Sequence, residues 1–334
     1  MAILTLVVLC ASWGMQQVAI KIASQGISPV LQSGIRSVGA TILVALWMWL
    51  RGDSIFRRDG TLWWGLGAGI LFALEFVLIY VGLEYTNASR AVIFLYLSPF
   101  VVALGAHLFI PGERLRIIQV IGLLSAFTGI IVAFSESLNA PTMRMLVGDG
   151  MLAVAAVFWG ATTVLIKAGP LVSVSPAKTL LYQLGISAVV LMLGFLVWDE
   201  PGITKMTPAI ALSLVYQVIW IATITYLAWF WLITRYPAYK LASFTFLTPL
   251  FGVMFGGIIL NEPITVSLLV ALILVGTGIC LVNRKQSNKS LIETCSDRSR
   301  FSKKFYQTCL SSGYIRSLQP HSAFWGWWRL VLYR

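Results

Sequence analysis

The chain has 334 residues, of which 58% are hydrophobic and 11% are charged, with a formal net charge of +12. Soluble domains contain about 45–50% apolar and about 25% charged residues, so the composition excludes an ordinary soluble domain and indicates a membrane protein. The positive charge does not point to nucleic acid, because +8 of it falls in the last segment of the chain, from Arg284 onward. A basic segment beside a membrane span is instead attracted to anionic lipid.

Ten apolar stretches follow one another along the chain, each close to the roughly 20 residues that a helix needs to cross a bilayer. They are too long and continuous for the alternating strands of a membrane barrel. The sequence therefore predicts an all-α multi-pass membrane protein with ten transmembrane helices. We place these at 2–22, 29–50, 61–83, 89–110, 115–134, 148–168, 176–198, 208–234, 238–260 and 265–283.

The second half of the chain repeats the first. Trp13 and Lys21 return as Trp159 and Lys167 at an offset of 146, and a block at 88–99 returns at 238–249 at an offset of 150. Five spans per copy is an odd number, so the second copy must cross the membrane upside down. Internal repeats of spans are typical of secondary transporters, whose substrate sites lie between the repeats. We expect a first repeat at 1–134, a linker at 135–147, a second repeat at 148–285 and a basic, disordered tail at 286–334.

Charge in the loops predicts the orientation, because short cytoplasmic loops collect Lys and Arg. With both termini in the cytoplasm, eleven basic residues lie on the inner side and four on the outer side. The inner ones are Arg51, Arg57, Arg58, Arg114, Arg116, Lys167, Lys178, Arg235, Lys240, Arg284 and Lys285, and the outer ones are Lys21, Arg90, Arg144 and Lys205. We expect a bacterial inner-membrane protein with cytoplasmic N- and C-termini.

Ionisable side chains inside spans are costly and mark functional candidates. Arg36 and Glu75 are predicted at one depth, some 10–12 Å below the outer surface at 1.5 Å per residue. One interpretation is a buried ion pair that locks two helices together. The other is a site in which Arg36 attracts an anionic substrate group and Glu75 exchanges partners or protons.

Aromatic and amide side chains near mid-membrane predict a weakly polar cavity around this pair. The candidates for its lining include Trp13, Trp159, Tyr80, Tyr96 and Gln183. Pro99 and Pro249 fall in the middle of the fourth and ninth spans, where each frees the carbonyl four residues earlier. We expect the two kinks to face each other and to offer backbone groups to a substrate.

Acidic residues also recur at one place in the two copies. Glu113 and Glu262 stand at the start of the fifth and tenth spans, where the helix macrodipole stabilises a carboxylate. We expect each to cap its own span.

Several classes of chemistry find no support. The cysteines form no CxxC pair and there are two histidines, so we expect no metal, no disulfide and no cofactor. A G-x-S-x-G elbow and a P-loop are both missing, so we expect no catalytic residues and no use of ATP.

Taken together, these motifs resemble the EamA-type branch of the drug/metabolite transporter superfamily. The resemblance covers residues 1 to about 285 and rests on the repeated WG-x6-K opening, a Pro in the second span, an (S/T)P in the fourth and an acidic residue opening the fifth. It implies inverted five-helix repeats and the export of small metabolites such as amino acids or drugs. Two features depart from the pattern: Gln183 stands where the first copy has Arg36, and the tail after Lys285 has no counterpart.

We therefore expect a secondary transporter, an exporter of amino acids or drug-like compounds that works by alternating access. Its partners would be a small-molecule substrate, the lipid bilayer and protons, with no nucleic acid. GxxxG spacings at 65/69 and 252/256 favour packing within the bundle, with a homodimer as the alternative. The competing interpretations are a channel, a non-transporting scaffold and an intramembrane hydrolase.

Overall fold

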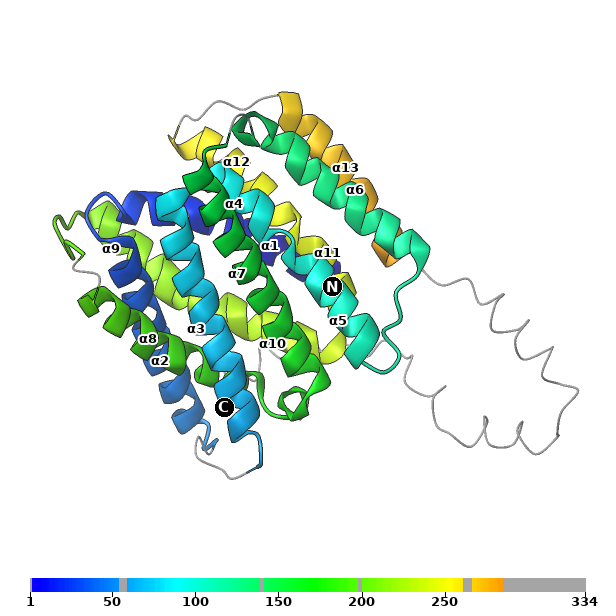
Figure 1. Cartoon of the computed structure of the whole chain (residues 1–334). Coiled ribbons are helices and arrows are strands. Elements are labelled where there is room, and N and C mark those ends of the chain that lie inside the picture. The colour runs from blue at the N-terminus through cyan, green and yellow to red at the C-terminus, as the bar shows by residue number, and fades with distance from the viewer. Residues whose placement is uncertain (1, 54–58, 139–140, 198–199, 261–265, 285–334) are drawn as a thin grey trace, which may run out of the picture. The chain divides into compact units, whose positions relative to one another are not determined.

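The computed structural model describes residues 2–53, 59–138, 141–197, 200–260 and 266–284 (Figure 1). These residues form helices and one isolated antiparallel bridge, between Ile27 and Ile203. The predicted tail at 286–334, Glu262 and positions 54–58 lie outside the described residues. An all-α multi-pass fold is confirmed: within the described part, nine helices are long and apolar enough to cross a membrane, and Ile117–Ala133 is a shorter apolar helix.

Each predicted span corresponds to one helix or to consecutive helical segments. The first half contains α1 (Ala2–Ala23), α2 (Pro29–Leu50), α3 (Leu62–Tyr85), α4 (Ala88–Leu95), α5 (Ser98–Phe109), α6 (Ile117–Ala133) and the short 3-10 helix η1 (Ser135–Leu138). The second half contains α7 (Met143–Ala168), the 3-10 helix η2 (Pro170–Ser173), α8 (Pro176–Val197), α9 (Pro208–Val215), η3 (Tyr216–Thr225), α10 (Tyr226–Arg235), α11 (Ala238–Thr245), α12 (Leu247–Leu260) and α13 (Val266–Asn283).

Local signals explain where several of these helices begin. Pro29 and Pro208 occupy the first turns of α2 and α9, where a missing N–H costs nothing. Helix α7 begins at Met143, five residues before the predicted start of the sixth span, because the Thr142 side chain caps it by accepting from the backbone N–H of Met145.

The fourth and ninth spans are each broken in two, before Pro99 and Pro249 respectively. Proline cannot donate to the preceding turn, so the helix ends and restarts there. The two breaks meet: the ring of Tyr96 lies 6.1 Å from that of Phe246, and the ring of Phe100 lies 6.4 Å from the same partner. Tyr96 and Phe246 are counterparts at the offset of 150.

The eighth span contains a feature that we did not predict. Between α9 and α10 the ten residues of η3 form a π-helix rather than an α-helix. Such segments are rare and frequently occur at functional sites. The segment packs against α1 and α2.

Contacts between the two halves are reciprocal. A Cβ placed on Gly14 would lie 2.5 Å from Phe251, and one on Gly160 would lie 2.5 Å from Val101, which is the same contact with the halves exchanged. Helix α2 packs on its counterpart α8, where the Ser187 hydroxyl donates to that of Ser37 at 3.0 Å, and α6 packs on its counterpart α13 (Figure 1). Reciprocal contacts of this kind are what a two-fold relation produces. The inverted orientation of the copies and the boundaries of the repeats stay predictions.

Gly14 gives a test of this packing. An added Cβ would lie 2.8 Å from the backbone nitrogen of Gly252, which cannot move aside like a flexible side chain. We expect Gly14→Ala to lower the stability by about 1–3 kcal/mol, the usual range for overpacking, in thermal unfolding of the detergent-solubilised protein. The control is Gly150→Ala on α7, where no atom lies within 4 Å and alanine should be neutral or slightly stabilising. Equal melting temperatures for the two variants would contradict the close approach.

Candidate functional site

A cavity of about 320 Å³ lies inside the helix bundle, at the lower end of the roughly 300–1,000 Å³ range of small-molecule pockets. Its walls come from both halves of the chain: α1, α2, α3 and α4 from the first, and α7, α8, α10 and α12 from the second. We name the two ends of the bundle after the turns that they contain, the α3–α4 end and the α10–α11 end.

The cavity extends unequally toward these two ends. Its lining reaches Leu83 and Ala88, which flank the α3–α4 turn, and Ile20 near the end of α1. At the other end it stops at Ile166 and Phe230. Ile20 is half-buried whereas its counterpart Ile166 is 2% exposed, so the cavity is more open toward the α3–α4 end.

Seven of the nine candidates from the sequence come together in this lining. They are Arg36, Glu75, Trp13, Trp159, Tyr80, Tyr96 and Gln183. Pro99 and Pro249 are buried but are not among the lining residues. Their neighbours Leu95 and Thr248 do line the cavity, so the helix breaks shape it.

Arg36 supplies the cationic group of the site. Its side chain is 3% exposed, and its Nη2 donates to the hydroxyl of Ser33, one turn earlier on α2, at 3.0 Å. The guanidinium carbon lies 4.8 Å from the ring centroid of Phe76, which is a cation–π distance. These two contacts hold the guanidinium in place while leaving further donors for a ligand, because arginine carries five N–H groups.

Glu75 supplies a carboxylate, and its Oε2 atom is buried without a hydrogen-bond partner. Within the described residues, no ion pair joins it to Arg36. The arrangement is therefore not the closed pair that a helix lock requires, and both charges face the same cavity. The Gln183 Oε1 atom is likewise buried and unpartnered. Buried acceptors without donors are costly, and an ammonium group in the cavity would satisfy them.

Aromatic rings form much of the remaining wall. Trp13 packs edge-on against Trp229 and Tyr226, with ring centroids 5.3 and 6.4 Å apart. Trp159 packs edge-on against Tyr96 at 6.0 Å. Such walls suit the apolar part of a small molecule, and Arg36 and Glu75 add two ionisable groups to the same lining.

The π-helix fixes one of these tryptophans in place. The indole N–H of Trp13 donates to the Thr225 hydroxyl at 2.9 Å. The preceding residue, Ser12, accepts from the Tyr216 hydroxyl at its carbonyl and from the Trp220 indole at its hydroxyl, both at 2.9 Å. Ser12 and Thr225 were not among the candidates from the sequence. The offset of 150 that aligns Thr225 with Glu75 was the available signal.

A polar cluster lies at the α10–α11 end of the bundle. The ammonium of Lys167 donates to the carbonyls of Ile233 and Tyr236, which are at the end of α10. The Glu113 Oε2 atom accepts from the backbone N–H of Ala238 at 2.7 Å, and its Oε1 lies 4.0 Å from the Lys167 nitrogen. Burial raises the pKa of the Glu113 carboxyl, against the opposing effects of these two partners.

We expected Glu113 to cap the fifth span, which is α6, and this expectation was wrong. Glu113 lies in the loop before α6, whose N-cap is Arg116. It caps α11 in the other half of the chain instead, because the turn between α10 and α11 comes within reach of this loop.

Removing this cap should weaken the α10–α11 end. We expect Glu113→Ala to lower the stability by about 1–2 kcal/mol, the upper part of the range for a lost N-cap, in thermal unfolding of the purified protein. Glu113→Gln keeps an acceptor for the Ala238 N–H and should lose less. If the two substitutions were equally destabilising, the hydrogen bond to Ala238 would not be the main contribution.

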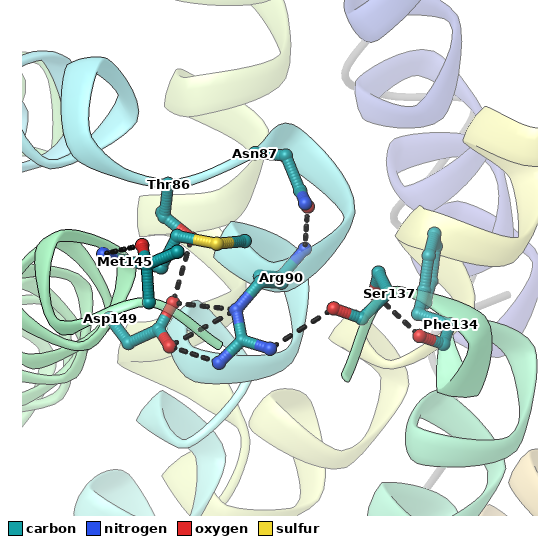
Figure 2. A network of polar contacts seen from close by, with 8 residues as sticks. Thr86, Asn87, Arg90, Phe134, Ser137, Met145 and Asp149 are labelled. Atoms are coloured by element: carbon teal, nitrogen blue, oxygen red, sulfur yellow. Dashed lines mark hydrogen bonds and ion pairs between the residues drawn. The ribbon is translucent and has the colours of Figure 1, made fainter. Parts of the chain in front are cut away.

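A second buried polar network joins the two halves at the α3–α4 end (Figure 2). Arg90, in the first turn of α4, forms a two-pronged ion pair with Asp149 of α7, and both side chains are 3% exposed. The Thr86 hydroxyl donates to the same carboxylate at 2.9 Å, and the Arg90 Nη1 donates to the Ser137 carbonyl at 3.0 Å. From the sequence we counted Arg90 only as a loop charge. The missed signal was Asp149, an acid inside a predicted span.

Comparisons with known proteins agree with this fold. The model of the EamA-like transporter family matches the chain twice, at 1–135 and 146–284. The uncharacterized transporter YvbV of Bacillus subtilis is 28% identical over 84% of this chain and 91% of its own. A protein of Escherichia coli called "Probable amino-acid metabolite efflux pump" is 26% identical over 80% of this chain and 89% of its own. A protein of known crystal structure, 17% identical, has the same fold, with a TM-score of 0.72 over 84% of this chain and 97% of the other.

The family model covers nearly all of the described helices, and the two relatives above are named as a transporter and as an efflux pump. The chain belongs to the EamA-like transporter family.

Proposed function

We propose that the protein is a secondary transporter that exports a small zwitterion of the amino-acid type through this cavity. The observation that carries the proposal is the lining, in which the guanidinium of Arg36 and the unpartnered carboxylate oxygen of Glu75 face one space with aromatic walls. A compound with a carboxylate, an ammonium and an apolar side chain would satisfy all three features. The name of the E. coli relative supports the same class of substrate.

The transport cycle that we propose is alternating access by two inverted repeats. The double match of the family model and the reciprocal contacts between the halves support it. In such proteins the two repeats rock around a central site. A proton on Glu75 would serve as the coupling ion when no substrate ammonium is bound.

We further propose that the protein lies in a bacterial inner membrane with both termini in the cytoplasm. The excess of basic residues in the loops on one side supports this orientation. The α3–α4 end then faces outward and the α10–α11 end faces the cytoplasm. The cavity is more open toward the outward end, as expected for an exporter that is ready to release its substrate.

Labelling with a membrane-impermeant maleimide tests this orientation in intact cells. After replacement of Cys10, Cys280, Cys295 and Cys309, thiols are introduced singly at two exposed positions. We expect Ser135→Cys, in η1, to be labelled from outside, and Asp53→Cys, after α2, to be labelled only after lysis. The opposite pattern would invert the topology.

Counterflow in proteoliposomes tests the activity itself. Vesicles that contain the purified protein are loaded with an unlabelled amino acid and diluted into a trace of the same compound in labelled form. We expect at least one amino acid with an apolar side chain to accumulate transiently and saturably, with no accumulation in protein-free vesicles. A linear, non-saturable flux would favour a channel, and the absence of flux for every amino acid would contradict the proposed substrate class.

A further inference from the structure

The two cavity tryptophans are counterparts, yet they have different environments. Trp13 is hydrogen-bonded to Thr225 and packs on Tyr226 and Trp229 of α10. Trp159, its counterpart at the offset of 146, packs instead on Tyr96, the residue that follows α4. Its side chain is half-buried in the cavity wall, and its indole N–H has no hydrogen-bond partner among the described residues. The site is therefore asymmetric at positions that the repeat relates to each other.

The counterpart of Thr225 is Glu75. Thr225 is the last residue of η3 and stands ten residues before the end of α10 at Arg235, just as Glu75 stands ten residues before the end of α3 at Tyr85. The residue that would accept the Trp159 indole N–H is therefore a carboxylate, and its Oε2 atom is unpartnered. The hydrogen bond from Trp13 to Thr225 is formed in the half where the helix is π-helical. The equivalent bond from Trp159 to Glu75 is not formed in the half where the helix is α-helical.

From this asymmetry we propose that Trp13 and Trp159 exchange roles between the two access states, with Glu75 as the acceptor for Trp159 when the cavity opens at the α10–α11 end. The inference rests on the proposed alternating access. A cycle that exchanges the conformations of two inverted repeats also exchanges the contacts of counterpart residues. In the second state Trp13 therefore leaves Thr225 and packs on Phe246, the counterpart of Tyr96, while Trp159 packs on Phe76, the counterpart of Tyr226.

This exchange couples substrate binding to access. In the state open at the α10–α11 end, the indole N–H of Trp159 donates to the Glu75 carboxylate. A substrate ammonium that binds Glu75 displaces the indole and removes one contact that favours that state. After release at the α3–α4 end, Glu75 is again free to accept the indole N–H, which favours the return. A ligand shifts a two-state equilibrium only through such differential contacts.

Thiol accessibility in the substrate-free protein tests the exchange directly. Ile20 and Ile166 are counterparts that line the two ends of the cavity, so Ile20→Cys and Ile166→Cys make a matched pair of reporters. They are introduced singly into the full chain without other cysteines and placed in lipid nanodiscs. A bulky maleimide reaches each thiol only when that end of the cavity is open, so the rate of labelling reports the opening of each end.

Two substitutions should shift the ratio of labelling rates, Ile20→Cys over Ile166→Cys, in opposite directions. Thr225→Val removes the acceptor for Trp13 and should lower the ratio about 2- to 10-fold, the range expected for one hydrogen bond. Glu75→Leu removes the acceptor for Trp159 and should raise the ratio. Thr225→Ser and Glu75→Gln keep an acceptor at each position and should retain the wild-type ratio, and the double variant Thr225→Val with Glu75→Leu should lie between the single variants.

Shifts in the same direction, or equal ratios in all variants, would overturn the exchange. The assay needs no substrate, so its outcome is independent of the identity of the transported compound. Counterflow measured on the same wild-type preparation separates the two proposals. Opposite shifts without amino-acid counterflow would leave the exchange standing and refute the substrate class, whereas counterflow without opposite shifts would refute the exchange alone.

Discussion

Replacement of Asp149 by Ala should lower the stability by about 3–5 kcal/mol, because it leaves Arg90 as a buried cation without its partner. The Arg90 guanidinium is 3% exposed and directs its Nε and Nη2 atoms at this carboxylate. Its remaining hydrogen bond, to the Ser137 carbonyl, does not neutralise the charge. We expect lower yields of folded protein and a lower melting temperature in detergent.

Two further variants make this prediction specific. The double replacement Arg90→Met with Asp149→Leu removes both charges, and much of the stability should return, as in other buried ion pairs that are exchanged for apolar groups of similar volume. Arg144→Ala is the matched control, because Arg144 is an exposed arginine at the same end of the bundle and its loss should cost about 1 kcal/mol or less. If the double variant were as unstable as Asp149→Ala, the stranded charge would not be the cause.

Arg36→Ala should abolish most of the transport without a comparable loss of folded protein. A charged group that binds a substrate charge in a desolvated site contributes about 2–5 kcal/mol, so we expect the initial rate at low substrate concentration to fall about 30-fold or more. Arg36→Lys keeps the charge but loses the planar stacking on Phe76, and should recover only part of the rate. Initial rates of counterflow, normalised to the amount of reconstituted protein, give the comparison.

The matched control is Arg51→Ala. The Arg51 guanidinium lies 4.8 Å from the ring of Trp47, the same distance as between Arg36 and Phe76, but it is exposed outside the cavity. Its loss should leave transport at wild-type rates. The double variant Arg36→Ala with Glu75→Gln separates binding from a structural lock. A lock predicts that Glu75→Gln rescues the Arg36→Ala protein, whereas a substrate site predicts no recovery of transport.

Much of the fold could be predicted from the sequence, because membrane spans leave strong signals. Ten apolar stretches became helices at nearly the predicted places, and proline marked both broken spans. The repeat indicated which residues would share a cavity, and seven of the nine candidates do line it. This worked because counterparts in a repeat occupy equivalent positions, and mid-span polar residues avoid lipid.

Other features depend on contacts that spacing does not reveal. The π-helix Tyr216–Thr225 has the composition of an ordinary span, and Tyr216, Trp220 and Thr225 are held by bonds to α1 that exist only in the folded protein. Asp149 is the second residue of the predicted sixth span, and no spacing in the sequence indicates Arg90 as its partner. The partner of Glu113, the N–H of Ala238, belongs to the other half of the chain.

The central claim is that the cavity recognises both charges of a zwitterion, one through Arg36 and the other through Glu75. It is tested most directly by competition in counterflow, with three compounds that share one side chain. For the best amino-acid substrate, these are the unlabelled amino acid itself, its decarboxylated amine and its deaminated carboxylic acid. The account predicts that the amino acid inhibits labelled uptake at least tenfold more potently than either analogue, because each analogue leaves one buried charge unpaired. Equal inhibition by all three compounds would contradict it.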